Sequence, residues 1–160
     1  MDPLLPIATR VAALLKARKQ TVAVAESSTG GLLAASLLAV PGASAYFLGG
    51  AVVYTKPART LLMGISDAQM RGMRSSSEPY AMLLARTQRQ RFGATWGLAE
   101  TGASGPSGNR YGDAAGHTCV AISGPFEKVL TLETASDDRL ANMRAFTRAA
   151  LALLEEALAA

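Results

Sequence analysis

The segment from residue 21 to residue 31 constrains the fold more than any other part of the chain. Residues 21–25 (Thr-Val-Ala-Val-Ala) have the length and composition of a short buried strand. The polar turn Glu26-Ser27-Ser28-Thr29-Gly30-Gly31 follows directly, and helical character then lasts until Pro41-Gly42. A strand that enters a helix through a tight turn is typical of α/β proteins. The segment therefore predicts an α/β domain with this turn as its active or ligand-binding site.

The rest of the chain alternates in the same way. Three short or early helices are expected: one at residues 2–18 with Asp2 as the cap, one at 57–63, and one capped by Ser66-Asp67. A longer helix is expected after the cap Ser77-Glu78-Pro79, and its core-facing residues are Leu83, Leu84, Thr87 and Phe92. The last helix is expected after the cap Asp137, and its core stripe consists of Leu140, Met143, Thr147, Ala150, Leu151, Leu154 and Leu158. Further strands are expected at 47–54, at 95–100, and as a hairpin of 118–123 and 128–134 turned by Gly124-Pro125. This order predicts a three-layer α/β/α sandwich around a mixed, mostly parallel sheet of about five strands, in one domain spanning residues 1–160.

Size and composition exclude several classes of protein. The 160 residues contain no apolar run close to the roughly 18 residues that a membrane span needs. Residues 1–4 do not resemble a secretory signal. We therefore expect a cytoplasmic protein without a membrane partner. Cys119 is the only cysteine and lies in a strand-like segment, which predicts a structural role. The net charge of +4 suits an anionic ligand. Because the basic residues are scattered, nucleic-acid binding is not expected, and a homodimer is expected only from its general frequency.

The turn after the first strand admits two interpretations. The hydroxyls of Ser27, Ser28 and Thr29 can cap the helix, or exposed N–H groups at the positive helix end can bind a phosphate or a developing oxyanion. Gly30 and Gly31 would let a ligand approach the backbone closely. The Walker pattern is absent, but the same geometry can expose a serine nucleophile. These residues alone leave capping and ligand binding open.

A partner for such a serine is harder to find. His117 is the only histidine, and at the start of a strand it is expected to be structural. The segment Tyr54-Thr55-Lys56-Pro57-Ala58-Arg59 places a tyrosine and two cations where a helix begins, which is typical of either a surface turn or a site. The Gly-rich loop from Thr101 to Gly116 is expected to be functional because of its length. Its first part, Thr101 to Gly108, is a candidate to close over a phosphate or ribose, with Asp113 and Glu100 as candidates for the ribose hydroxyls. No metal-ligand cluster is visible, so neither a metal nor another cofactor is expected.

Four segments together resemble the CinA C-terminal domain family, which includes stand-alone nicotinamide-nucleotide amidohydrolases. They are Ala25-Glu26-Ser27-Ser28-Thr29-Gly30-Gly31-Leu32, Val40-Pro41-Gly42-Ala43-Ser44-Ala45-Tyr46-Phe47, the Val53-Tyr54 strand end, and Thr101-Gly102-Ala103-Ser104-Gly105-Pro106. The resemblance covers nearly the whole chain and agrees with the α/β/α sandwich. It implies competence/damage-inducible relatives and a hydrolase that converts nicotinamide mononucleotide and water to nicotinate mononucleotide and ammonia, in recycling of NAD.

The resemblance also implies roles for individual residues. Ser27 matches the family's nucleophile and Tyr54 its active-site tyrosine. The substrate-binding loops correspond to Ser28, Thr29, Gly30 and Gly31, and to Thr101, Gly102, Ala103, Gly105 and Pro106.

One position departs from the family pattern. The family's lysine is Arg59 here, and an arginine cannot act as a general base. Three alternatives follow: Lys56 takes the role, Tyr54 relays the serine proton while Arg59 supplies charge, or the chain binds a pyridine nucleotide without turning it over, as a binding or scaffold protein.

Overall fold

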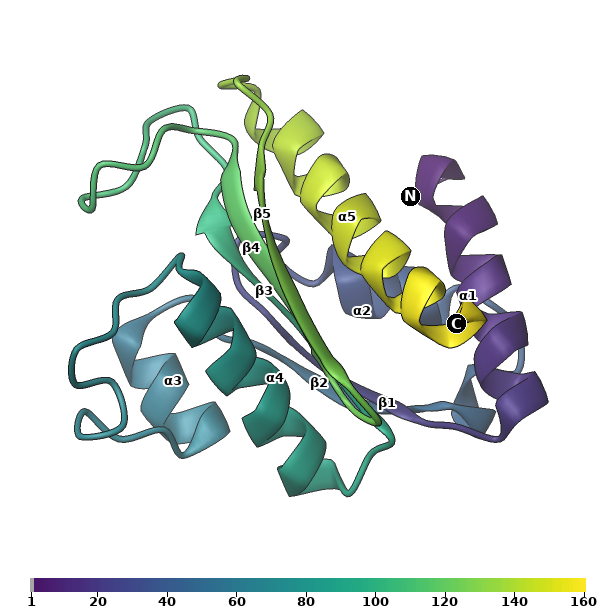
Figure 1. Ribbon diagram of the computed structural model, residues 1–160. Coiled ribbons are helices and arrows are strands. Elements are labelled where there is room, and N and C mark those ends of the chain that lie inside the picture. The colour runs from purple at the N-terminus through teal and green to yellow at the C-terminus, as the bar shows by residue number, and fades with distance from the viewer. Residues whose placement is uncertain (1) are drawn as a thin grey trace.

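A five-stranded sheet lies between two layers of helices in the computed structural model, which describes residues 2–160 (Figure 1). The strands are β1 (Val22–Glu26), β2 (Phe47–Val52), β3 (Trp96–Ala103), β4 (His117–Ser123) and β5 (Glu127–Glu133), in the order β2-β1-β3-β4-β5. β1 pairs in parallel with β2 and β3, whereas β4 is antiparallel to both of its neighbours. Four strands therefore run in one direction, which confirms the predicted mixed, mostly parallel sheet and the hairpin at its end.

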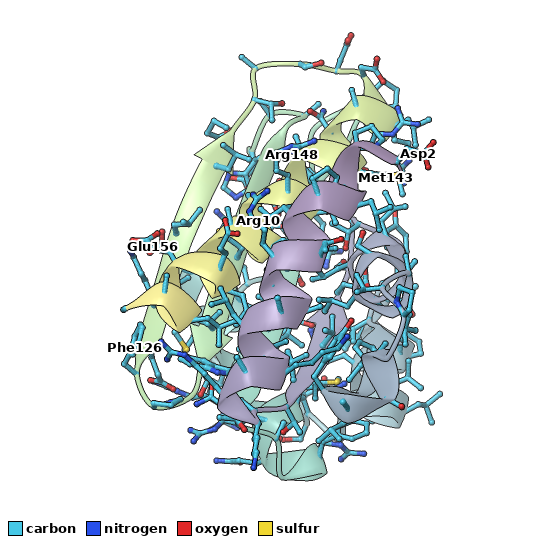
Figure 2. The ribbon with its side chains drawn as sticks, turned by 90° about the vertical axis from the view of Figure 1, so that its right-hand side faces the viewer. Asp2, Arg10, Phe126, Met143, Arg148 and Glu156 are labelled. Atoms are coloured by element: carbon cyan, nitrogen blue, oxygen red, sulfur yellow. The ribbon has the colours of Figure 1, made fainter. Side chains whose placement is uncertain are left out.

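The helices divide between the two faces of the sheet. One face carries α1 (Leu5–Arg18), α2 (Leu32–Leu38) and α5 (Arg139–Ala159), and the other carries α3 (Lys56–Met63) and α4 (Glu78–Phe92) (Figure 1). A short 3-10 turn at Asp2–Leu4 precedes α1, and another at Ala43–Ala45 precedes β2. Figure 2 shows α5 beside α1, and Arg10 of α1 pairs with Glu155 of α5 at 2.6 Å. Within residues 2–160 no helix is both long and apolar enough to cross a membrane.

Two apolar cores separate the sheet from its helical layers. The larger core joins α1, α2 and α5 to residues such as Val24, Leu98 and Val120, and the smaller one joins α3 and α4 to Ala25, Ala99 and Cys119. All five residues of β1 are buried because this strand is central and both of its faces are covered. Cys119 is buried in the smaller core, where burial raises the pKa of its thiol.

Several local predictions were wrong. Asp138, not Asp137, caps α5 by accepting the Ala141 N–H at 3.1 Å. Ser66 does accept the Gln69 N–H at 3.2 Å, but the segment continues as turns and forms no helix. Phe92 and Leu140 lie near helix ends and are 42% and 51% exposed, so neither belongs to the core. Periodicity alone cannot tell where a helix leaves the surface that it covers.

Close packing of α4 on β3 depends on Gly97. A Cβ added there would lie 1.9 Å from the Ala85 carbonyl oxygen, which is backbone and cannot move aside. We expect Gly97→Ala to lower the free energy of unfolding by about 2–3 kcal/mol through overpacking, measured by urea denaturation. Gly50→Ala is the control, because its nearest contacts are ordinary ones at 3.5 Å. Equal stability of the two variants would contradict this packing.

Candidate active site

The candidate site lies where the parallel strands β1 and β2 end. The chain leaves β1 toward α2 on one face of the sheet and leaves β2 toward α3 on the other face (Figure 1). Such a divergence opens a crevice beyond the carboxyl ends of the strands, the usual ligand position in open α/β sheets. A cavity of about 500 Å³ lies there, lined by Ser27, Tyr54, Lys56 and Arg59 among others. The four residues considered for catalysis therefore share one cavity.

The Glu26 carboxylate organises the turn that follows β1. It is 1% exposed and accepts hydrogen bonds from the N–H groups of Gly31 (2.9 Å), Leu33 (3.1 Å) and Ala34 (2.9 Å). The Thr29 hydroxyl donates to the same carboxylate at 2.6 Å. A carboxylate therefore caps α2 and balances the positive end of this helix.

Glu100, inside β3, is a second fully buried carboxyl group beneath the same turn. One of its oxygens accepts the N–H groups of Ser27 (3.0 Å) and Thr29 (3.1 Å), and the other accepts the hydroxyls of Ser28 and Thr118. Burial raises the pKa of Glu100, although the hydrogen bonds from Ser28, Ser27, Thr118 and Thr29 oppose the rise. Glu100 holds the turn from inside and is not available to a ribose hydroxyl, contrary to expectation.

These carboxyl groups change how the turn can act. The Gly30 and Leu32 N–H groups bond to the Ser27 and Thr29 carbonyls, so between residues 27 and 34 only the Ser28 N–H lacks a partner among the described residues. The side chains of Ser28 and Thr29 are buried against Glu100 and Glu26. Of the backbone N–H groups of this turn, the structure therefore leaves that of Ser28 for the anion-binding interpretation.

Ser27 differs from its two hydroxyl neighbours. It is half-buried and lines the cavity, and its Oγ makes no hydrogen bond to any part of the chain between residues 2 and 160. Because the Ser27 N–H is held by Glu100 at 3.0 Å, the backbone is fixed while the hydroxyl remains available. This arrangement suits a nucleophile or a ligand-binding hydroxyl.

Arg139 is a site residue that sequence reasoning missed. From the first turn of α5 it donates to the Tyr54 hydroxyl at 3.2 Å and to the Gly105 carbonyl oxygen. A second cavity of about 370 Å³ adjoins this contact, and its lining includes Ser28, Gly102, Ala103, Gly105 and Pro106. A cation at a helix N-terminus is unfavourable because it opposes the helix dipole. An arginine in the first turn of a predicted helix could therefore have indicated a functional role for Arg139.

The two cations after Tyr54 lie in different environments. Lys56 has a side chain that is 69% exposed, with its Nζ 3.8 Å from Asp67. Arg59 is only 8% exposed, and one of its terminal nitrogens lies 3.6 Å from the same carboxylate. The Arg59 Nε is buried and has no hydrogen-bond partner within residues 2–160.

The loop of residues 104–116 and the connection before α4 together close the cavity. Arg74 of the connection binds Asp113 of the loop at 2.7 Å and lies over the Tyr111 ring at 5.3 Å. Burial raises the pKa of Asp113, but the hydrogen bonds from Arg74 and Asn109 outweigh it and leave this pKa lowered. Asp113 therefore anchors the loop and, like Glu100, is not free for a ribose, whereas Arg110 and Tyr111 line the cavity. Within residues 2–160 no group of three or more His, Cys, Asp or Glu is arranged to hold a metal.

His117 helps to hold together the segments that close the cavity and does not belong to a catalytic triad. Its Nδ1 lies 2.5 Å from Glu133 Oε1 and its Nε2 lies 2.8 Å from the Ser76 carbonyl oxygen. Both partners are acceptors, so the protonated ring satisfies both. Burial lowers the pKa of His117, but the bonds to Glu133 and Ser76 and the charge of Asp113 outweigh it and raise this pKa.

The raised pKa of His117 predicts a pH-dependent stability. The stabilisation is fully present below the unfolded-state pKa of about 6.5 and is lost as the pH rises through the folded-state value. Because Glu133 is partly exposed, we expect an effect of about 1 kcal/mol. Chemical denaturation should show a larger stability difference between wild type and His117→Gln at about pH 5 than at about pH 8. The same difference at both values would show that folding does not raise the pKa of His117.

Comparisons with known proteins agree with this geometry. The family model of the CinA C-terminal domain matches residues 5–158. A CinA-like protein of Gloeobacter violaceus is 43% identical over 76% of this chain and 28% of its own length, and one of Chlorobaculum tepidum is 40% identical over 86% and 34%. The chain therefore spans about a third or less of the length of these relatives.

Solved structures resemble the whole chain. A competence-damaged protein (CinA) superfamily protein from Klebsiella pneumoniae has a TM-score of 0.91 at 28% identity and covers 98% of both chains. The competence/damage inducible protein CihA from Agrobacterium tumefaciens has a TM-score of 0.88 at 28% identity, covering 98% of this chain and 96% of its own. This chain belongs to the CinA C-terminal domain family.

Proposed function

We propose that the protein is an amidohydrolase that converts nicotinamide mononucleotide to nicotinate mononucleotide and ammonia. The observation that carries the proposal is the Ser27 hydroxyl, which lacks a hydrogen bond within residues 2–160 and lies in a cavity with four cationic side chains. The cavity volume of about 500 Å³ suits a small ligand. A serine for an amide and positive charge for a phosphate are the two features that such a substrate requires.

The proposed reaction follows the usual course of acyl transfer. Ser27 Oγ attacks the carboxamide carbon, and its proton passes to the amide nitrogen, which leaves as ammonia. Water then cleaves the ester on Ser27 and releases the carboxylate. The Ser28 N–H is the one backbone donor of the turn left for the oxyanion, so a second donor must come from the cavity wall or the neighbouring loop.

The serine proton must be carried to the amide nitrogen, and Tyr54 fits this role better than Lys56, because a phenol hydroxyl can accept the serine proton while it gives its own proton to that nitrogen. Arg139 holds the Tyr54 hydroxyl at 3.2 Å, which fixes its position at the boundary of both cavities. Lys56 is exposed and lies near Asp67, so its ammonium group is not held toward the serine. Arg59 stays protonated and contributes charge only.

A binding protein without turnover is the second candidate, and the arginine at position 59 favours it. The two candidates separate in one pair of measurements on the wild-type protein: ammonia release from nicotinamide mononucleotide, and calorimetric binding of the same nucleotide. Turnover supports the amidohydrolase. Binding with no ammonia supports the binding protein, and neither binding nor turnover would contradict both.

A further inference from the structure

The Arg59 guanidinium is the least satisfied charged group near the cavity. It lies on the first turns of α3, is 8% exposed, and its Nε has no hydrogen-bond partner within residues 2–160. Removing a charged donor from water without a partner is unfavourable, so such a group is expected where a ligand completes it. Its contact with Asp67 at 3.6 Å is long and involves a different nitrogen.

The surroundings of Arg59 set the charge of the ligand that completes it. Lys56, Arg74 and Arg110 line the same cavity, and none of the residues that line it is an aspartate or glutamate. Asp113 is turned toward Arg74 and Asn109, and Asp67 is a largely exposed residue of the turns after α3. The cavity therefore favours an anion, and the buried guanidinium is its most desolvated cation.

The position of Arg59 also limits its role. Burial lowers the pKa of a lysine, but an arginine stays protonated at neutral pH and cannot act as a base. Its planar guanidinium can instead bind two oxygens of one phosphate. Tyr80 lies beside it, and although burial raises the pKa of Tyr80, the neighbouring Arg59 opposes that rise. A buried tyrosine and a buried arginine in a cavity whose lining contains no carboxylate form a site for an oxyanion.

We propose that the Arg59 guanidinium, which lines the cavity, binds the phosphate monoester of the ligand. The proposal rests on the proposed function only in identifying the remainder of the ligand as a pyridine nucleoside. It assigns Arg59 to substrate recognition and leaves the bond-breaking steps to Ser27 and Tyr54. The arginine at this position then serves recognition of the ligand, and its presence does not imply loss of the site.

The test measures binding of ribose 5-phosphate, ribose and nicotinate by calorimetry, so that no turnover is needed. We expect wild type and Ser27→Ala to bind ribose 5-phosphate alike and ribose far more weakly. Arg59→Met, which keeps an unbranched apolar stem and removes the guanidinium, should weaken ribose 5-phosphate binding by about 10- to 100-fold, as expected for loss of a charge-assisted hydrogen bond. Arg144→Met, at an exposed position on α5, is the matched control and should bind like wild type.

Each other outcome overturns the proposal. Ribose 5-phosphate binding by Arg59→Met within about twofold of wild type would show that Arg59 is not a phosphate ligand. Nicotinate bound more tightly than ribose 5-phosphate would place a carboxylate there instead, and no phosphate binding by wild type would remove the subsite. Thermal unfolding separates folding from recognition, because Arg59 is a buried charge whose contact with the exposed Asp67 is long, and replacing such a charge by an apolar side chain should not lower Tm. A large drop in the Tm of Arg59→Met would indicate a structural role. Failure of the amidase reaction alone would leave the binding results unchanged.

Discussion

Replacing Ser27 with alanine should reduce ammonia release from nicotinamide mononucleotide by about 10³-fold or more, while nucleotide binding stays within about threefold of wild type. The hydroxyl is the proposed attacking group, so its loss removes the covalent route. Its Oγ has no hydrogen bond within residues 2–160, so the substitution should leave the turn intact. The measurement is steady-state ammonia release at saturating nucleotide, together with calorimetric binding.

The matched control for this experiment is Ser44→Ala. Ser44 is exposed in the 3-10 turn Ala43–Ala45, away from both cavities, and its loss should not change the rate. Ammonia release by Ser27→Ala at the wild-type rate would show that another group attacks the carboxamide. A loss of both rate and binding would indicate that Ser27 holds the ligand without reacting with it.

Replacing Glu26 with glutamine should destabilise the fold by about 2–3 kcal/mol, whereas the same change at Glu100 should cost less than about 1 kcal/mol. Glu26 accepts backbone N–H groups at both oxygens, from Gly31 and Leu33 at one and from Ala34 at the other. A glutamine NH₂ group therefore faces an N–H donor in either orientation, and neither backbone group can rotate away.

Glu100 tolerates the amide because one of its oxygens meets only the hydroxyls of Ser28 and Thr118. A hydroxyl can rotate to accept, and Thr118 has the Thr101 carbonyl oxygen at 3.1 Å as an alternative acceptor. Burial also disfavours the charged form of Glu100 and raises its pKa, and the amide that replaces it is neutral. Urea denaturation of both variants measures the difference. Equal losses, or a larger loss at Glu100, would contradict the assignment of Glu26 as the cap of α2.

The layers of the fold and the location of the site were predictable from the sequence because they depend on local patterns. The apolar block before Glu26, the Gly-rich loop after Thr101 and the turn at Gly124-Pro125 each carry their own signal. Parallel strands end at one edge of the sheet, so Ser27, Tyr54 and Thr101 meet at one cavity. The expected homodimer and the cytoplasmic location stay predictions.

The remaining features depend on contacts between distant residues. Nothing near Glu100 in the sequence shows that its carboxyl group would lie beneath the Ser28 turn, 72 residues away along the chain. The pairing of Arg139 with Tyr54 spans 85 residues. The burial of Arg59 beside an exposed Lys56 depends on how α3 packs, because both residues lie on the same short helix. Local sequence identified the groups at Ser27, Tyr54, Lys56 and Arg59 but not Arg139, and only the packing showed which of them are free.

The most direct test of the site is a crystal structure of Ser27→Ala with bound nicotinamide mononucleotide, since this variant should bind without turnover. We expect the carboxamide carbon to lie at about 3–3.5 Å from the position of the missing hydroxyl, beside the Ser28 N–H, with the phosphate against Arg59. A carboxamide that points away from residue 27, or a nucleotide bound outside this cavity, would contradict the proposed function.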